Sequence, residues 1–169
     1  VHTQSDEVKK SIGYMSQKFS MYDDLTVKEN ITFFGGTYGL SRKQIKKKTA
    51  ELIEELQLGD ITKSRVGSLP LGWKQKLAFS VSLLHEPKIV FLDEPTGGVD
   101  PITRRQFWEL IYTEADKGTT IFVTTHYMDE AEYCDRVSIM VDGSIEALDT
   151  PKNLKQQFKV DSMNDVFLK

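Results

Sequence analysis

Two adjacent carboxylates follow an apolar run near the middle of the chain. Residues 89–92 are apolar, and Asp93 and Glu94 come directly after them. Four apolar residues in a row are too few for a helix and are typical of a fully buried strand. Neighbouring side chains diverge at a strand end, so one acid could hold a metal ion while the other polarises water, as phosphoryl transfer requires. The alternative is a solvated acidic turn, which Pro95 and Thr96 make less favoured.

A histidine follows the next predicted strand. Residues 119–124 are predicted to form a second buried strand, and Thr125 and His126 come next. Because ligands bind beyond the carboxyl ends of parallel strands, this imidazole would lie on the same sheet edge as the two acids. There it could donate to a phosphate or orient a water molecule. A purely structural hydrogen bond is the alternative role for a single histidine at this position.

The elements that must position these residues alternate between strand and helix from residue 88 onward. This alternation predicts parallel strands joined by crossovers, and therefore an α/β domain. The stretch 27–86 is predicted to be helical and resembles an insertion into that domain. The expected strands are 11–16, 88–93 and 119–124, with a hairpin of 136–141 and 144–148; the expected helices are near 27–38, 42–58, 71–85, 101–117, 127–133 and from 151 onward.

Local signals mark where several of these elements begin and end. Ser41 and Gln44 form a capping box at the start of one helix, and Gly59 is placed just past its end. Asp100-Pro101 supplies an N-cap and a proline at the first helical position of another helix. Asp142-Gly143 is a strong signal for a type I′ hairpin turn.

Composition describes an ordinary globular chain of 169 residues, with 22 Lys and Arg against 25 Asp and Glu and a net charge of −3. This slightly acidic balance argues against a dedicated nucleic-acid binder, and no apolar run is long enough to span a bilayer. The single cysteine, Cys134, allows neither an intrachain disulfide nor a zinc cluster, which favours the cytosol. The basic run at 42–48 is a solvated helix face or, alternatively, a contact with an anionic membrane surface.

The order of these motifs resembles the ATP-binding subunit of an ABC transporter. Residues 92–96 resemble the Walker B strand with its following glutamate, 97–100 lie at the D-loop position, and His126 matches the switch histidine. Upstream, residues 13–17 resemble the strand and glutamine of the Q-loop, and 68–75 lie where the signature motif belongs. The likeness covers nearly the whole chain and is greatest to the exporter branch with ABC-2-type permeases, which includes multidrug efflux systems.

The resemblance implies part of a P-loop NTPase domain, with a mostly parallel sheet flanked by helices and an inserted helical subdomain. Residues 1–17 would be the N-terminal remnant of the ATPase core, 18–86 the helical subdomain with the signature region, and 87–169 the C-terminal part of the core. The sequence contains no Gly-Lys pair, and hence no Gly-x-x-x-x-Gly-Lys-Ser/Thr phosphate loop. We therefore expect a C-terminal portion of the domain, and a start at Val1 instead of Met agrees with this.

Each motif residue receives a role from this resemblance. Asp93 would hold Mg²⁺, since a hard carboxylate suits that ion, and Glu94 would be the general base for the attacking water. Gln17 would sense both Mg²⁺ and that water, although a plain loop glutamine is the alternative. His126 would contact the γ-phosphate of ATP. Asp100 would reach across a dimer interface, and capping its own helix is a role that it can fill as well.

The signature region departs from the family's usual Leu-Ser-Gly-Gly-Gln. Pro70 replaces the serine, Leu71 the first glycine and Trp73 the glutamine, whereas Gly72 and the leading leucine match. A helix that begins here still suits an anion, so these four residues and Asp100 are the candidates for contacts with nucleotide. Trp73 and Lys74 could compensate for the lost groups by stacking or charge, and plain helix packing is the alternative for Trp73.

The resemblance thus implies an ATP-binding and hydrolysing subunit that drives an exporter through a separate membrane permease. Its partners would be that permease and a second ATP-binding subunit, as a homodimer, with no nucleic acid, and its location the inner face of the cell membrane on the cytoplasmic side. We expect these 169 residues alone to be inactive, since they lack the phosphate loop. A soluble ATPase of the same superfamily, acting in DNA maintenance or translation, and a truncated domain without enzymatic activity are the alternatives.

Overall fold

A three-stranded parallel sheet organises the first of the two units into which the chain divides, Val1–Thr124 and Thr125–Lys169. The computed structural model describes all residues except 1–4 and 19–20. Strands β1 (Ile12–Met15), β2 (Ile89–Asp93) and β3 (Thr120–Thr124) pair in that order, and both pairings are parallel. The predicted strands and their direction are therefore confirmed. The three-part division predicted from the sequence does not coincide with these two units and stays a prediction.

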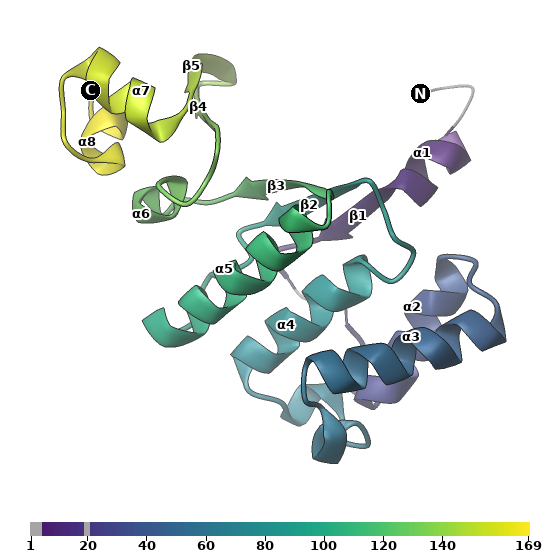
Figure 1. The fold of residues 1–169 in the computed structure, drawn as a ribbon. Helices are drawn as coiled ribbons and strands as arrows, with labels where there is room; N and C mark the ends of the chain where they lie inside the picture. The colour runs from purple at the N-terminus through teal and green to yellow at the C-terminus, as the bar shows by residue number, and fades with distance from the viewer. Residues whose placement is uncertain (1–4, 19–20) are drawn as a thin grey trace. The chain divides into compact units, whose positions relative to one another are not determined.

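One face of this sheet is covered by helices α4 (Leu71–Ser82) and α5 (Pro101–Asp116) (Figure 1). Val90 and Leu92 on β2 point toward them and are buried. Phe79 of α4 and Phe107 of α5 pack against each other with ring centroids 5.4 Å apart, and both are buried. The apolar surface buried between these two helices and the sheet stabilises this part of the unit.

The other face of the sheet carries exposed aromatic side chains. Tyr14, Phe91 and Phe122 lie opposite one another on the three strands and are 57%, 36% and 54% exposed. The prediction that residues 88–93 and 119–124 form strands buried on both faces is therefore wrong. The reason is that α4 and α5 both pack on the same face, so these two helices leave every second residue of each strand uncovered. A short helix, α1 (Ser5–Ser11), precedes β1 and was not predicted.

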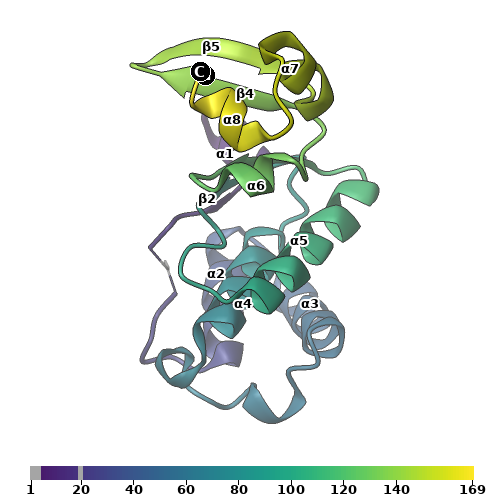
Figure 2. The ribbon, with the colours of Figure 1, turned by 90° about the vertical axis from the view of Figure 1, so that its left-hand side faces the viewer.

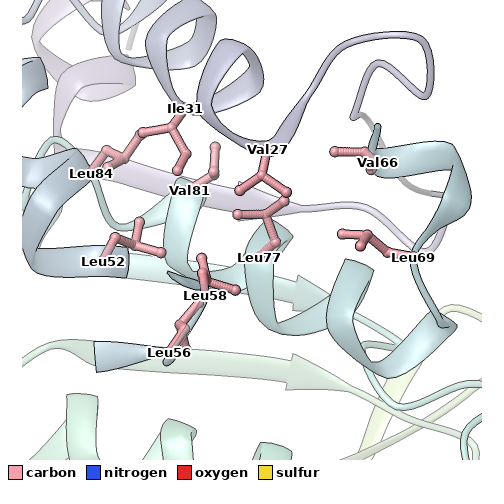
Figure 3. Close-up of a cluster of buried hydrophobic side chains, with 10 residues drawn as sticks. All are labelled: Val27, Ile31, Leu52, Leu56, Leu58, Val66, Leu69, Leu77, Val81 and Leu84. Atoms are coloured by element: carbon pink, nitrogen blue, oxygen red, sulfur yellow. The ribbon is translucent and has the colours of Figure 1, made fainter. Parts of the chain in front are cut away.

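Helices α2 (Val27–Thr37) and α3 (Arg42–Glu55) form a second apolar core with the inner face of α4. Figure 3 shows the ten buried side chains of this core converging from these helices, from the 3₁₀ turn at 66–68 and from residues that directly follow the helices and that turn. They are Val27, Ile31, Leu52, Leu56, Leu58, Val66, Leu69, Leu77, Val81 and Leu84. The predicted helical stretch 27–86 therefore folds around its own core.

The start of α3 follows the predicted capping box, but its end does not follow the predicted glycine. The Ser41 hydroxyl accepts a hydrogen bond from the Gln44 backbone N–H, and the Gln44 side-chain oxygen accepts one from the Ser41 backbone N–H. The residue that turns the chain is Gln57, with φ of 53°, and not Gly59. Leu58 N–H then donates to the carbonyl of Ile53, and the burial of Leu58 stabilises this closure of the helix end.

The second unit contains the antiparallel hairpin of β4 (Val137–Val141) and β5 (Ser144–Asp149). Its two turn residues, Asp142 and Gly143, have φ angles of 49° and 83°. Two consecutive positive φ angles define the predicted type I′ turn, which is confirmed.

Three short helices complete the second unit: α6 (Met128–Ala131), α7 (Pro151–Phe158) and α8 (Met163–Phe167). Figure 2 shows α7 and α8 beside the hairpin. Their shared core consists of Ala131, Ala147, Leu154, Met163 and Val166. Across the described part of the chain, every helix is too short or too polar to cross a bilayer.

Candidate functional site

A hydrogen bond joins the loop after β1 to the turn after β2. The Nε2 atom of Gln17 donates to Oε2 of Glu94 at 2.6 Å. Met15 and Leu92 are register partners near the ends of their strands, so both segments leave the sheet at the same edge. Two predicted site residues that are 77 positions apart in sequence are therefore in direct contact.

The backbone of Glu94 adopts a conformation that is rare for residues with a side chain. Its φ angle is 45°, in the left-handed region. Its N–H is held at the end of β3, 3.0 Å from the carbonyl oxygen and 3.2 Å from the hydroxyl oxygen of Thr124. Such conformations cost about 1–3 kcal/mol and cluster at functional sites. The strained turn directs the Glu94 carboxylate toward Gln17.

Asp93 lies one residue earlier, at the end of β2. Its Oδ1 atom accepts a hydrogen bond of 2.7 Å from the Thr124 hydroxyl. No cluster of three or more acidic, histidine or cysteine side chains that could hold a metal occurs in the described residues. Mg²⁺ does not need one, because it is usually bound by one or two carboxylates together with substrate phosphates and water. The Asp93 carboxylate and the side-chain oxygen of Gln17 are hard donors that fit this requirement.

A cavity of about 360 Å³ lies between the N-terminal ends of α4 and α5. The four signature residues Pro70, Leu71, Gly72 and Trp73 line it together with Asp100. Helix α4 has Pro70 at its N-cap and no capping side-chain hydrogen bond. The first N–H groups of α4 are thus suited to an anion such as a phosphate. The structure therefore brings all the predicted signature residues to one cavity.

Gly72 is required where α4 meets α5. A Cβ atom at this position would lie 2.5 Å from the Cγ2 methyl of Thr103. At this distance Thr103 or one of the helices would have to shift, so the matched glycine of the signature allows the close packing of α4 and α5. Deeper in α4, Nε2 of the buried Gln75 donates to the carbonyl of Gly97 at 3.1 Å. This bond ties α4 to the turn that follows Glu94, and sequence reasoning missed it.

The positive charge beside Trp73 comes from Lys76. Its Nζ atom lies 5.5 Å from the centroid of the Trp73 ring and 2.8 Å from Oε1 of Gln106. Lys76 lines the cavity, whereas Lys74 forms an ion pair with Asp23 at 3.2 Å. The helical spacing from Trp73 could have indicated Lys76, because residues three positions apart share a helix face.

Asp100 caps helix α5, as the sequence predicted. One carboxylate oxygen accepts from the backbone N–H groups of Ile102 and Thr103, at 3.0 Å each, and the other accepts from the Thr103 hydroxyl. The hydrogen bonds from the side chain and backbone of Thr103 hold the pKa of Asp100 below its usual range. Contact across a dimer interface stays a prediction for this residue.

His126 belongs to the second unit, where its side chain is exposed. Its ring centroid lies 4.1 Å from that of Tyr127, with the two planes inclined by 36°. The role of His126 at the acidic edge of the sheet stays a prediction.

The loop that follows Gln17 is fastened to α2 by one buried side chain. Asn30 is fully buried, and its amide donates to the carbonyl oxygens of Tyr22, Leu25 and Thr26 while accepting from the Tyr22 N–H. Sequence reasoning missed this residue, although an asparagine among the apolar positions of a helix is a recognisable signal.

A second cavity, of about 380 Å³, lies among α3, α4 and α5 and contains none of the predicted site residues. Its charged side chains pair with one another: Lys48 with Glu86, and Lys117 with Glu114 at 3.1 Å. It has the character of a solvated gap between helices.

Comparison with known proteins agrees with the motif order. A family model described as "ABC transporter" matches residues 1–97. The chain is 48% identical to "Probable multidrug ABC transporter ATP-binding protein YbhF" of Escherichia coli (strain K12), over 95% of this chain and 28% of that protein. It is 33% identical to "Linearmycin resistance ATP-binding protein LnrL" of Bacillus subtilis (strain 168), over 96% of this chain and 55% of that protein. The chain therefore spans about a quarter of the length of the first relative and about half of the length of the second.

Solved structures show the same likeness. One titled "Structure of ATP binding subunit of ABC transporter" superposes with a TM-score of 0.83 and 26% identity, over 99% of this chain and 71% of that one. Another, cbiO1 from Clostridium perfringens, described as part of the ABC transporter complex cbiONQ, gives a TM-score of 0.78 and 26% identity, over 89% and 61%. With the family match covering more than half of its residues, this chain belongs to the ABC transporter family, as an ATP-binding domain.

Proposed function

We propose that this chain contributes the hydrolytic and signature elements of an ATPase that drives an exporter through a separate membrane permease. The observation that carries the proposal is the 2.6 Å hydrogen bond between Gln17 and Glu94. It joins the candidate general base to the candidate sensing loop at the edge of a parallel sheet, where nucleotides bind in such folds. The names of the relatives, which include multidrug and linearmycin resistance ATP-binding proteins, support export as the process.

In the proposed mechanism, Glu94 orients the attacking water and accepts its proton. The Gln17 amide holds the Glu94 carboxylate in position, and the strained backbone at Glu94 fixes the direction of approach. Asp93, with Gln17, would hold Mg²⁺, most simply through water. Bound Mg²⁺ supplies positive charge against the phosphates of ATP. His126 would donate to the γ-phosphate.

The cavity between the N-terminal ends of α4 and α5, which the signature residues line, would receive the phosphates of an ATP bound to a second ATP-binding subunit. The N-terminal end of α4, which begins at Leu71, would supply N–H donors where the family uses a serine and a glycine. Lys76, whose ammonium group lies over the Trp73 ring, would supply positive charge to the phosphates in place of the missing serine and glycine groups. Asp100 would contact the second subunit, and we expect a homodimer.

Contact with the permease would use the aromatic surface that follows Gln17. Tyr22 and Phe33 are 49% and 46% exposed, and their rings meet edge to face at 4.8 Å. Phe34 packs against Phe33 at 5.4 Å. Because Asn30 binds this loop to α2, a permease segment seated on the surface could move the Gln17 loop. Such contact would hold the domain at the inner face of the cell membrane.

A Glu94→Gln substitution in the natural protein that carries this sequence tests the proposal. Glutamine keeps the shape of the side chain but cannot accept the proton, so we expect ATP turnover to fall by about 10²–10⁴-fold while nucleotide binding persists. The matched control is Glu54→Gln, an exposed glutamate of α3, which should leave turnover unchanged. Equal turnover in the Glu94→Gln and unsubstituted proteins would overturn the role of Glu94, and absence of turnover in both would favour the non-enzymatic alternative.

We further propose that residues 1–169 alone neither bind Mg-ATP tightly nor hydrolyse it. The reason is that the sequence contains no Gly-Lys pair and therefore no phosphate loop, whose backbone N–H groups and lysine bind the nucleotide phosphates. Isothermal titration calorimetry of the chain with Mg-ATP should show no saturable heat at micromolar concentrations. Micromolar binding in that experiment would contradict the prediction.

A further inference from the structure

A fully buried carboxylate lies four residues after His126. Glu130 of α6 is 0% exposed, and its Oε2 atom accepts a hydrogen bond of 2.6 Å from the hydroxyl of Thr125. Both residues belong to the second unit. Removing a carboxylate from water is costly unless hydrogen bonds compensate. The mechanism above assigns no task to Glu130.

The contacts of Glu130 enclose the backbone of His126 on both sides. The Thr125 hydroxyl that donates to Glu130 also accepts from the Tyr127 N–H at 3.0 Å. The Glu130 N–H donates to the Tyr127 carbonyl, again at 3.0 Å. The residues before and after His126 are thus both bound to Glu130, either directly or through one hydroxyl.

Glu130 lies beside an apolar core in the sequence of α6. The next residue, Ala131, is also buried and belongs to the apolar core of the second unit. A buried carboxylate beside this core is costly unless hydrogen-bond donors compensate it, and the Thr125 hydroxyl is one such donor. The carboxylate at 130 gives the Thr125 hydroxyl a fixed direction, and through it orients the peptide groups around His126.

We propose that Glu130 is a positioning residue for His126. It acts through Thr125, which sets the backbone from 125 to 127 and so the orientation of the imidazole. The catalytic consequence rests on the proposed function, in which His126 contacts the γ-phosphate. The structural effect can be measured without nucleotide.

Nuclear magnetic resonance of residues 1–169 with labelled histidine tests the structural effect. The chain has three histidines, so the spectrum is simple. The His126 ring lies 4.1 Å from the Tyr127 ring, and its chemical shifts therefore report small changes of the backbone between them. We expect Glu130→Ala and Thr125→Val to shift the His126 ring signals in the same direction. Glu130→Gln, whose amide oxygen can still accept from Thr125, should return them toward the original positions.

The control is Asp135→Ala, which removes an exposed carboxylate from the same unit. It should leave the His126 signals in place, and His85, in the first unit, should be unchanged in every variant. Unshifted His126 signals in Glu130→Ala and Thr125→Val would overturn the proposal. So would equal shifts in Glu130→Ala and Glu130→Gln. If Glu130→Ala unfolds, the comparison of Thr125→Val with Glu130→Gln decides, because both retain a side chain of nearly native size.

Kinetics of the natural protein test the catalytic consequence. Glu130→Ala should lower kcat for ATP by up to about 100-fold, the cost of misplacing a reacting group, with little change in KM. Glu130→Gln should recover most of that loss. If the ring signals respond but turnover does not, Glu130 positions His126 and the assigned role of His126 in hydrolysis is wrong. If the unsubstituted protein has no turnover, the proposed function fails while the resonance result still decides the positioning role.

Discussion

At the scale of single residues, Glu94 is held from two directions. Its backbone N–H is fixed at the end of β3 by Thr124, and its carboxylate is fixed by the Gln17 amide. The left-handed φ angle lies between these two anchors. Pre-organised groups of this kind need little rearrangement when the reaction begins. The arrangement explains why a glutamate occupies a backbone position that glycine or asparagine would adopt more easily.

His85 is a second residue whose surroundings set its chemistry. Its Nε2 atom donates to the Ile12 carbonyl at 3.0 Å, and its ring stacks on Tyr38 with centroids 4.0 Å apart. Burial lowers the pKa of His85, despite the opposing effect of the Ile12 carbonyl. The unfolded chain therefore binds a proton at a higher pH than the folded chain does. Stability should fall as the pH drops below about 6.5, the ordinary value for histidine, toward the lowered folded value.

The substitution His85→Gln should reduce this dependence, because glutamine can still donate to Ile12 but does not titrate. Urea unfolding at about pH 7.5 and pH 5 measures the effect as the change in the free energy of unfolding between the two conditions. That change should be larger for the unsubstituted chain than for His85→Gln. An equal loss in the two proteins would assign the pH dependence to other groups.

Residue type was enough to predict part of the site. Asp93 and Glu94 could be predicted because acids that follow a parallel strand lie at the sheet edge where ligands bind, whereas Gln17 was indicated only by the resemblance to the Q-loop of ABC ATP-binding subunits. Gln75 and Lys76 were not, because their contacts depend on how α4 is rotated against α5 and the turn after Glu94. That rotation is set by packing between segments distant in sequence, which local patterns do not contain.

At the scale of elements, α4 and α5 approach each other closely at Gly72. A methyl group on Gly72 would collide with the Thr103 methyl. We expect Gly72→Ala to lower the free energy of unfolding by about 1–3 kcal/mol, the usual cost of overpacking. The double variant with Thr103→Ser, which removes that methyl but keeps the hydroxyl bonded to Asp100, should recover most of the loss.

Gly36 offers the matched control for this prediction. It lies in α2, and a Cβ atom there would have no neighbour within 4 Å. Gly36→Ala should therefore raise the free energy of unfolding by about 0.5–1 kcal/mol, because alanine favours the helix. Urea unfolding of the four proteins measures both effects. A loss for Gly72→Ala that persists with Thr103→Ser would show that the collision is not its cause.

Helix starts could be predicted at this scale, whereas strand burial could not. The caps at Ser41 and Asp100 depend on side chains within three residues, and both are present as expected. The burial of β2 and β3 depends on how many helices cover each face of the sheet. An apolar run is compatible with either outcome, so the aromatic face carrying Phe91 and Phe122 could not be predicted from the pattern.

At the scale of the whole molecule, that aromatic face predicts self-association. Tyr14, Phe91 and Phe122 form a row of exposed aromatic side chains across the three strands. Contiguous exposed apolar surface favours association. Light scattering of residues 1–169 should show a mass that rises with concentration, and the double variant Phe91→Ser with Phe122→Ser should reduce the rise. Ile102→Ser, which removes an isolated exposed side chain at the start of α5, is the control.

A strictly monomeric mass at every concentration would contradict the prediction for the unsubstituted chain. A reduction by Ile102→Ser as large as that of the double variant would indicate that association does not involve the row on the sheet. Both outcomes can be read from the same concentration series.

The hydrogen bond from Gln75 to the Gly97 carbonyl restricts how this family member can diverge. Each added or deleted residue in a helix turns the following side chains by about 100°. One insertion between Pro70 and Gln75 would therefore swing Gln75 away from Gly97 and detach the turn after Glu94 from α4. Side chains in the segment can be exchanged, as Leu71 and Trp73 already are, but its length cannot. Insertions and deletions should consequently be rarer than substitutions among functional descendants of this sequence.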